Sequence, residues 1–243
     1  MDFKGPQGFN TGSPVGPLSI LDDHSRYLLC LRRLGSTKAE GVRSALQATF
    51  EQVGLPEALV VDHGVPWFSP SSPWGLTELR VWIMRQGIRV VFSGLRHPQT
   101  QGKVERMHGA LQRAIRKRKA DPDDQAWLDA FREEYNLVRP HAGLQMQTPG
   151  SRWRPSARRF DPDPPEFDYP DSMQVLRLAG EGQLGWRGRR WEISNALRGQ
   201  RVGLELLGDR ALVYFCRTPL RELDLKTGRS LPLRSQLPGS LQR

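Results

Sequence analysis

The chain has 243 residues, enough for one large domain or for a medium and a small domain with cores of their own, and we expect two. Its net charge of +10 and its pI near 10.3 favour a polyanionic partner such as nucleic acid, although the same charge would also suit a ribosomal or membrane-surface protein. No apolar segment approaches the roughly 20 residues that a membrane span needs, and the N-terminus shows no signal-peptide pattern, so we predict a cytoplasmic protein.

Cysteine and histidine, the residue types that often mark disulfides or zinc sites, are sparse. Cys30 and Cys216 lie far apart, each inside an apolar run, which favours buried thiols in a reducing compartment over a disulfide. The five histidines lack zinc-ligand spacing; they are His24, His63, His97, His108 and His141. We therefore expect neither a disulfide nor a structural zinc site.

The N-terminal part of the chain predicts strands joined by polar turns. Residues 1–5 are typical of a short strand that carries Asp2, and a loop rich in Gly, Pro and Ser follows it. Two apolar runs within residues 18–34 flank the polar stretch Asp22–Arg26. This arrangement predicts a β-hairpin with a polar turn.

A helix and a buried strand follow the predicted hairpin. Thr37 and Glu40 have the spacing of a capping box, and apolar residues continue at helical spacing up to Val53. The apolar run at 58–61 is too short for a helix, so we interpret it as a buried strand that ends at Asp62. In α/β sheets, ligands gather outside the carboxyl ends of strands, which makes an acid at this position a candidate site residue.

The next elements alternate between helix and strand. Residues 76–87 predict a helix, and residues 89–93 predict another strand. A later helix opens at Asp124 and closes before Pro140. Its predicted inner face consists of Trp127, Leu128, Phe131, Tyr135 and Val138.

A strongly basic helix lies between these segments. Thr100 can cap its start, and Glu105 sits beside its apolar stripe. A second face carries cations that suit phosphates, although a solvated charged surface is the common alternative. These cations are Arg106, Arg113 and Lys117, with the basic tail Arg116–Lys119. Glu105 either pairs with one of them or holds a divalent metal, and the sequence alone leaves both open.

The last hundred residues change in character. Six prolines and little periodicity between Thr148 and Ser172 predict an extended linker. Short β-type runs separated by turns then predict a small barrel; they are residues 173–178, 191–193, 202–207, 211–216 and 220–225. We therefore expect a core domain at 1–147, a Pro-rich linker at 148–172 and a small β-barrel at 173–243.

A cluster of cations and aromatic residues marks the predicted barrel. Arg187, Arg189 and Arg190 are flanked by Trp186 and Trp191. Cations beside aromatic faces suit a nucleic-acid backbone, so we predict that this domain binds DNA. Core tryptophans with solubilising arginines around them explain the same pattern equally well.

Five stretches within residues 1–157 resemble, in their order, the insertion-sequence transposases of the DDE type. They are MDFKG from residue 1, LSILDDHSRYLL from 18, GLPEALVVDHG from 54, HPQTQGKVERMH from 97 and YNLVRPHAGLQMQTP from 135. This family belongs to the retroviral-integrase superfamily. The resemblance therefore implies an α/β fold, with a ribonuclease-H-like mixed β-sheet flanked by helices in the core and a small all-β, SH3-like barrel after the Pro-rich linker.

The resemblance also implies a reaction. Asp2, Asp62 and Glu105 match the three catalytic carboxylates, which would ligate two Mg²⁺ (or Mn²⁺) ions. Mg²⁺ prefers hard oxygen ligands, and two ions about 4 Å apart stabilise both the entering and the leaving oxygen of a phosphoryl transfer. The implied activity is cleavage at the transposon ends, followed by strand transfer of the 3′-hydroxyl into target DNA.

DNA, as transposon ends and as target, is the implied partner, and synapsis of two ends implies a homo-oligomer on DNA. Lys103 and Arg106 would hold the DNA end beside Glu105, and the basic tail would add non-specific phosphate contacts. The predicted DNA contacts are His97, Gln99, Lys103, Arg106, Arg113, Arg116, Lys117, Arg187, Arg189 and Arg190. For His97, a role in fixing its loop is the alternative.

Two features depart from the family pattern. His63 follows the second aspartate, where the family usually has Asn. Met1 directly precedes the first acid, whereas full-length members carry helix-turn-helix domains ahead of the core, so we expect either a fragment or a true start further upstream. The competing interpretations are a transposase-derived DNA-binding or regulatory protein without catalysis, and a ribonuclease-H-type nuclease that only hydrolyses.

Overall fold

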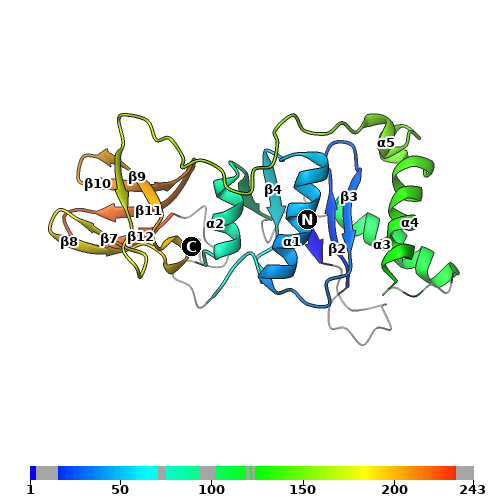
Figure 1. Cartoon of the computed structure of the whole chain (residues 1–243), viewed down its shortest axis with the longest axis horizontal. Helices are drawn as coiled ribbons and strands as arrows, with labels where there is room; N and C mark the ends of the chain where they lie inside the picture. The colour runs from blue at the N-terminus through cyan, green and yellow to red at the C-terminus, as the bar shows by residue number, and fades with distance from the viewer. Residues whose placement is uncertain (4–15, 71–74, 94–101, 119–120, 122–123, 234–243) are drawn as a thin grey trace. The chain divides into compact units, whose positions relative to one another are not determined.

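The computed structural model describes residues 1–3, 16–70, 75–93, 102–118, 121 and 124–233, and the chain forms two compact units (Figure 1). Unit 1 consists of Met1–Leu55 and Arg96–Phe160, and unit 2 consists of Pro56–Leu95 and Asp161–Arg243. Each unit contains both helices and strands, and unit 2 consists mostly of strands. The predicted α/β class is therefore correct. The domain boundaries expected after residues 147 and 172 were inferred from amino-acid composition, whereas the two units are defined by packing. The expected boundaries therefore stay a prediction.

Unit 1 begins with a three-stranded antiparallel sheet in the order β1-β2-β3 (Figure 1). Its strands are β1 (Asp2–Phe3), β2 (Leu18–Leu21) and β3 (Leu28–Arg32). The side chain of Asp22 closes the turn between β2 and β3, because its Oδ2 accepts hydrogen bonds from Ser25 N at 2.7 Å and Ser25 Oγ at 2.6 Å. The predicted hairpin with a polar turn is confirmed.

Helix α1 (Ala39–Val53) follows the sheet and buries the apolar stripe that its sequence predicts. The predicted capping box is wrong, however, since the N-cap is Lys38 and makes no side-chain cap. Thr37 therefore lies one residue before the N-cap position. From there its hydroxyl is not placed to accept a hydrogen bond from the first free N–H groups of the helix.

The other helices of unit 1 pack on the sheet through one apolar cluster. They are α3 (Gly102–Arg118) and α4 (Gln125–Glu133), and Asp124 caps α4 by accepting a hydrogen bond from Ala126 N. The cluster contains Leu28, Leu31, Val104, Met107, Ala110, Leu111, Ile115, Leu128, Phe131 and Tyr135. Thr100, the predicted cap of α3, lies outside the described residues.

A single π-helical turn, η2 (Glu134–Val138), continues α4 and changes which side chains face inward. Arg139 N donates to Glu134 O at 2.9 Å, five residues back, so the turn holds one residue more than an α-helical step. Asn136 is consequently buried at 3% exposure, whereas Val138 is 70% exposed. The prediction that Val138 belongs to the inner face is wrong for this reason.

The buried Asn136 completes the edge of the sheet. Its Nδ2 donates to Leu28 O at 3.0 Å, and its Oδ1 accepts from Leu28 N at 2.7 Å. The amide thus satisfies both backbone groups of a fully buried residue on β3, as a neighbouring strand would. Beyond η2, the chain forms η3 (Ala142–Leu144) and α5 (Pro149–Arg152), after which Trp153 stacks on Tyr27 with ring centroids 4.4 Å apart.

Unit 2 contains a parallel pair of strands joined through a helix. Strands β4 (Ala58–Val61) and β5 (Arg89–Phe92) pair in register from Ala58 opposite Arg89 to Val61 opposite Phe92, and α2 (Glu78–Arg85) lies between them in sequence. Thr77 caps α2 by accepting from Arg80 N. All three elements agree with the prediction.

The rest of unit 2 is all-β, as predicted for a small SH3-like domain. A five-stranded antiparallel sheet has the order β12-β11-β10-β9-β6, and β7 pairs with β8 separately. Their bounds are β6 (Gln174–Arg177), β7 (Gln183–Trp186), β8 (Arg189–Glu192), β9 (Arg201–Leu207), β10 (Arg210–Phe215), β11 (Thr218–Asp224) and β12 (Ser230–Pro232), with η4 (Asn195–Leu197) between β8 and β9. Trp186 and Trp191 are buried in its core, so the core interpretation is the right one for both tryptophans.

Strands β7 and β12 were not predicted from the sequence, and neither was the attachment of the Pro-rich segment to this sheet. Tyr169 is buried, and its hydroxyl accepts a hydrogen bond from Cys216 N at 3.0 Å. The same oxygen lies 3.1 Å from Arg201 O and 3.3 Å from Tyr214 O, to one of which it donates at a time. The ring also occupies the space above Gly203, where an added Cβ would lie 2.5 Å from it.

Two composition-based expectations can be compared with the structure. Cys30 and Cys216 are free and buried, and burial raises the pKa of the Cys216 thiol to about 12. Among the helices that the structure describes, none combines the length and the apolar character needed to cross a membrane.

Candidate active site and nucleic-acid interface

Asp2, the first predicted catalytic acid, is half-buried on β1 of unit 1, opposite Ser19 on β2. Ser19 Oγ donates to the backbone carbonyl of Asp2 at 2.9 Å and lies 2.7 Å from His108 Nε2 on α3. Since the serine proton goes to the carbonyl, the His108 nitrogen must be the donor of the second bond, which fixes its tautomer. Ser19 and His108 are both buried, so β1 is anchored to α3 despite its shortness.

Glu105, the third predicted acid, lies in the first turn of α3 and is exposed. Its carboxylate has neither a hydrogen bond nor an ion pair with any residue in the described part of the chain. Lys103 pairs instead with Asp23, whose Oδ1 lies 2.6 Å from its Nζ. A negative charge is favourable at a helix N-terminus, which helps to tolerate an unpaired carboxylate there.

A cavity of about 580 Å³ in unit 1 is lined by Glu105 and by other residues of α3 between Gly102 and Arg113. Its lining comes from two parts of the chain. We call the α3 residues its first wall, with the small residues Gly109 and Ala110 as its floor, and we call the segment between Tyr135 and Gly143 together with Arg26 of the β2–β3 turn its second wall. We call this cavity the basic groove. Its charged lining residues are Arg26, Lys103, Glu105, Arg106, Arg113 and Arg139.

Sequence analysis predicted only one wall of the basic groove. Lys103, Arg106 and Arg113 were expected to contact DNA, and all three line it. Arg116 and Lys117 are exposed further along α3 and do not belong to its lining. His97 and Gln99 lie outside the described residues.

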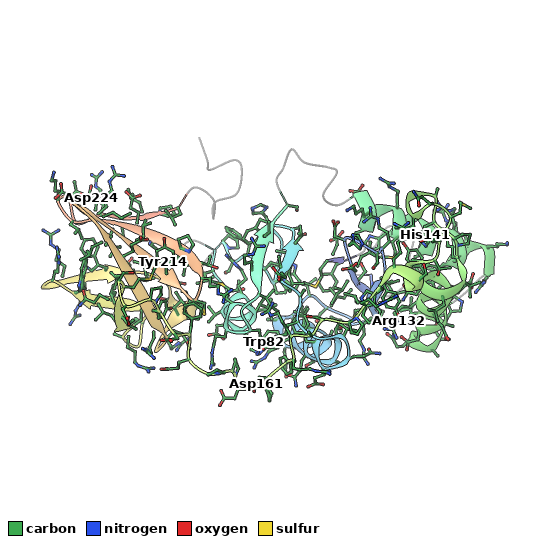
Figure 2. All side chains as sticks on the ribbon, turned by 90° about the horizontal axis from the view of Figure 1, so that it is seen from above. Trp82, Arg132, His141, Asp161, Tyr214 and Asp224 are labelled. Atoms are coloured by element: carbon green, nitrogen blue, oxygen red, sulfur yellow. The ribbon has the colours of Figure 1, made fainter. Side chains whose placement is uncertain are left out.

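The second wall was missed, although its residues are within stretches that carry the family resemblance. Arg26 has a left-handed backbone with φ of 65° and donates to Asp23 O within the hairpin turn. His141, labelled in Figure 2, packs its ring edge-on against Tyr135 with centroids 4.6 Å apart. Burial lowers the pKa of His141 below 6.5, a hydrogen bond with the Tyr135 backbone raises it, and the charges of Arg139 and Arg26 lower it further. His141 is thus neutral at pH 7.

Asp62, the second predicted acid, belongs to unit 2 and follows β4 directly, as predicted. It is half-buried, and its Oδ1 accepts from Gly64 N at 3.1 Å, which fixes the turn after the strand. Gly64 allows this close approach, since an added Cβ would meet the same carboxylate oxygen atoms at 3.1 and 3.3 Å.

His63, which stands where the family usually has Asn, is held by aromatic packing. Its ring stacks on Phe92 of β5 with centroids 4.6 Å apart, and its Nε2 is buried without a hydrogen-bond partner among the described residues. Burial lowers the pKa of His63, the Asp62 carboxylate raises it, and the nearby Arg80 lowers it. Arg80 itself is 2% exposed with its guanidinium 4.7 Å from the Phe92 ring centroid, and burial lowers its pKa only to about 10, so it stays charged.

The predicted barrel cations lie on the β7–β8 hairpin of unit 2. The guanidinium of Arg187 lies 4.7 Å from the Trp186 ring centroid, and Arg189 and Arg190 are exposed. Arg187 has a left-handed backbone with φ of 50°, and Gly188 follows with φ of 69°, which is the geometry of a tight hairpin turn. These three arginines present positive charge at the tip of a short hairpin, as a phosphate-binding surface requires.

The structure therefore brings two of the three predicted acids into one unit. Asp2 and Glu105 are in unit 1, and Asp62 is in unit 2. Within the described ranges, no group of three or more His, Cys, Asp or Glu side chains converges on a point where a metal ion could bind.

Two parts of the chain match models of known protein families. Residues 86–149 match the model of the integrase core domain, and residues 173–231 match the C-terminal domain of the IS481 family transposases. The fold is similar to a chain in the cryo-EM structure of the simian T-cell lymphotropic virus intasome in complex with the PP2A regulatory subunit B56 gamma. That match has a TM-score of 0.52 and 15% identity, and it covers 90% of this chain and 75% of the other. With an integrase core domain match followed by a match to a transposase C-terminal domain, the chain is similar in domain order to the insertion-sequence transposases of the integrase superfamily.

Proposed function

We propose that the protein is a DNA transposase that cleaves at transposon ends and transfers the freed 3′-hydroxyl into target DNA, with Mg²⁺ or Mn²⁺ as cofactor. The observation that carries the proposal is the Glu105 carboxylate, which has no partner among the described residues and lines the basic groove. The order of an integrase core domain and a transposase C-terminal domain supports the same reaction class.

The donor chemistry of the predicted site fits a hard divalent ion. Asp2, Asp62 and Glu105 offer only carboxylate oxygens, which Mg²⁺ prefers to nitrogen or sulfur ligands. When bound, the ions would stabilise charge on the attacking and leaving oxygens of an in-line displacement at phosphorus. We propose that these three acids hold them.

The remaining roles fall to the cations. Arg106, Arg113 and Lys103 bind phosphates of the DNA end beside Glu105, and their positive charges orient the scissile phosphate toward the carboxylate. Arg116, Lys117 and the β7–β8 hairpin arginines add phosphate contacts outside the groove. His97 and Gln99 complete the proposed set of DNA contacts, and two DNA ends are held by a homo-oligomer.

The test replaces each acid by its isosteric amide and analyses the DNA products. With end DNA, target DNA and Mg²⁺, we expect Asp2→Asn, Asp62→Asn and Glu105→Gln to lose strand transfer by at least about a hundredfold. Glu133→Gln is the matched control, because Glu133 is exposed on α4 and does not line the groove. Full strand transfer by Asp62→Asn or Glu105→Gln would contradict the assignment.

The products also separate the competing functions. Joined DNA identifies a transferase, and cut DNA without joining identifies a nuclease. Bound DNA without any reaction identifies a transposase-derived binding or regulatory protein.

A further inference from the structure

We infer that the basic groove grips one DNA strand from two sides, with Arg26 and Arg139 binding phosphates opposite the α3 cations. This inference rests on the proposed function and deepens it, because it extends the DNA contacts from one helix to a two-walled site. Neither arginine belongs to the DNA contacts predicted from the sequence.

The groove is positively charged because its cations are mostly unpaired. Among the described residues, Arg26, Arg106, Arg113 and Arg139 have no carboxylate within ion-pair distance, and only Lys103 has one, in Asp23. Four unpaired guanidinium groups facing a common space repel one another, so a bound anion would relieve this repulsion. Each guanidinium can also bind a phosphate through two parallel hydrogen bonds.

The size and the floor of the groove select the kind of ligand. A volume of about 580 Å³ is in the range of sites for small molecules, so it has room for one or two nucleotides of one strand, either single or within a duplex. Gly109 and Ala110 of α3 form the floor, and a Cβ added at Gly109 would meet only the end of the Arg113 side chain, at 3.5 Å. The floor is therefore smooth and leaves the backbone of a strand free to approach α3.

The second wall is stiff enough to hold Arg139 in place. Tyr135 is buried and contacts His141 edge-on, Arg139 N donates to Glu134 O at 2.9 Å, and His141 N donates to Gln147 O at 3.1 Å. Arg26 and Arg139 both line the groove together with Tyr135 and His141. A preorganised pair loses less conformational entropy on binding phosphate than two free surface arginines do.

DNA binding measured without divalent metal tests the inference independently of catalysis. The probe is a fluorescently labelled DNA duplex of arbitrary sequence, with the same strand unpaired as a second probe, titrated between about 50 and 200 mM salt. We expect Arg139→Gln and Arg26→Gln each to weaken binding about tenfold. Each should also reduce the slope of log affinity against log salt by about 0.9 on duplex DNA and about 0.7 on the single strand.

Two further variants separate the effect of the groove from the effect of losing a positive charge. Arg43→Gln is the matched control, because Arg43 is exposed on α1 of the same unit and does not line the groove. This variant removes the same charge outside the groove, so the slope of its log affinity against log salt should equal that of the wild type. Gly109→Gln adds no charge but fills the floor, so it should weaken DNA binding while retaining or improving helix stability.

The outcomes distinguish this inference from the proposed function. If Arg139→Gln, Arg26→Gln and Gly109→Gln all bind DNA as Arg43→Gln does, the two-walled grip is wrong. If they instead reduce self-association at unchanged DNA affinity, the groove takes an acidic segment of a second copy and the inference is also wrong. If these variants bind DNA more weakly and the wild-type protein neither cuts nor joins DNA, the two-walled groove is upheld and the catalytic proposal is rejected.

Discussion

Ser19 Oγ of β2 lies 2.7 Å from His108 Nε2 of α3, and both side chains are buried. Because Ser19 also donates to the Asp2 carbonyl, this pair connects the backbone of one predicted catalytic acid to the helix that carries another, Glu105. The relationship spans 89 residues of sequence. It makes the position of Asp2 depend on the integrity of α3.

The Ser19–His108 pair should show energetic coupling. Ser19→Ala and His108→Phe should each lower the free energy of unfolding by about 1–3 kcal/mol, because each removes the hydrogen bond between the two buried side chains. The double variant should differ from the sum by about 0.5–3 kcal/mol. Urea denaturation measures all three values. Additive losses would mean that the two side chains do not interact, and His108→Gln, which keeps a donor near Nε2, should recover part of the loss.

Asn136 should be essential to unit 1 although it is far from any predicted catalytic residue in sequence. Asn136→Ala removes both hydrogen bonds to Leu28 and leaves a buried N–H and C=O without partners, so the free energy of unfolding should fall by about 2–4 kcal/mol. Leu137→Ala is the neighbouring control, since Leu137 is 54% exposed. Equal stability of the two variants, measured by denaturation, would show that the amide does not support the sheet.

Tyr169 should hold the Pro-rich segment to the barrel. Tyr169→Phe deprives Cys216 N of its acceptor and should lower the free energy of unfolding of unit 2 by about 1–3 kcal/mol. Tyr214→Phe is a suitable comparison because its hydroxyl donates to the partly exposed Glu205, at 2.8 Å, and the loss of this bond should cost less. Thermal denaturation of both variants measures the difference, and a larger loss for Tyr214→Phe would contradict this ordering.

His63 should make the stability of unit 2 depend on pH. The pKa of His63 in the folded protein lies below the ordinary 6.5. Below pH 6.5 the unfolded chain is therefore protonated at His63 to a greater extent than the folded chain. The free energy of unfolding is therefore unaffected by this group above pH 6.5 and falls as the pH drops from 6.5 through the folded pKa. His63→Phe keeps the stacking on Phe92 and should show a shallower decline in urea unfolding below pH 6.5. His24→Gln, an exposed histidine in the β2–β3 turn, is the control, and an equally steep decline in His63→Phe would exclude the effect.

The local elements were predictable because short-range patterns determine them. The periodicity of α1 and α4, the apolar run of β4 and the polar turn at Asp22 all act within a few residues of sequence. The α3 cations were recognised in the same way, since the motif around Glu105 is continuous in sequence, whereas the catalytic role of the three acids was implied by the family resemblance and stays a prediction. What such patterns cannot specify is a partner about a hundred residues away.

Each failure of the sequence analysis involves such a partner or a change of helical register. The π-turn at Glu134–Val138 turns Asn136 inward toward Leu28 and Val138 outward, against a strictly α-helical projection. The second wall of the basic groove adjoins the same turn, because Arg139 follows it directly and its N–H donates to Glu134 O. Strand β12 has three residues and includes Pro232, so its pairing with β11 is recognisable only once β11 is in place.

The hydrogen bonds between Leu28 and Asn136 can form only late during synthesis of the chain. The two residues are 108 positions apart, so at 5–20 residues per second Asn136 is synthesised roughly 5–20 s after Leu28. During this interval the edge of β3 has no amide to satisfy it, and an unpaired strand edge is prone to pair with other chains. Newly made chains are thus expected to need a chaperone, or slow expression, at the stage when only the hairpin has emerged.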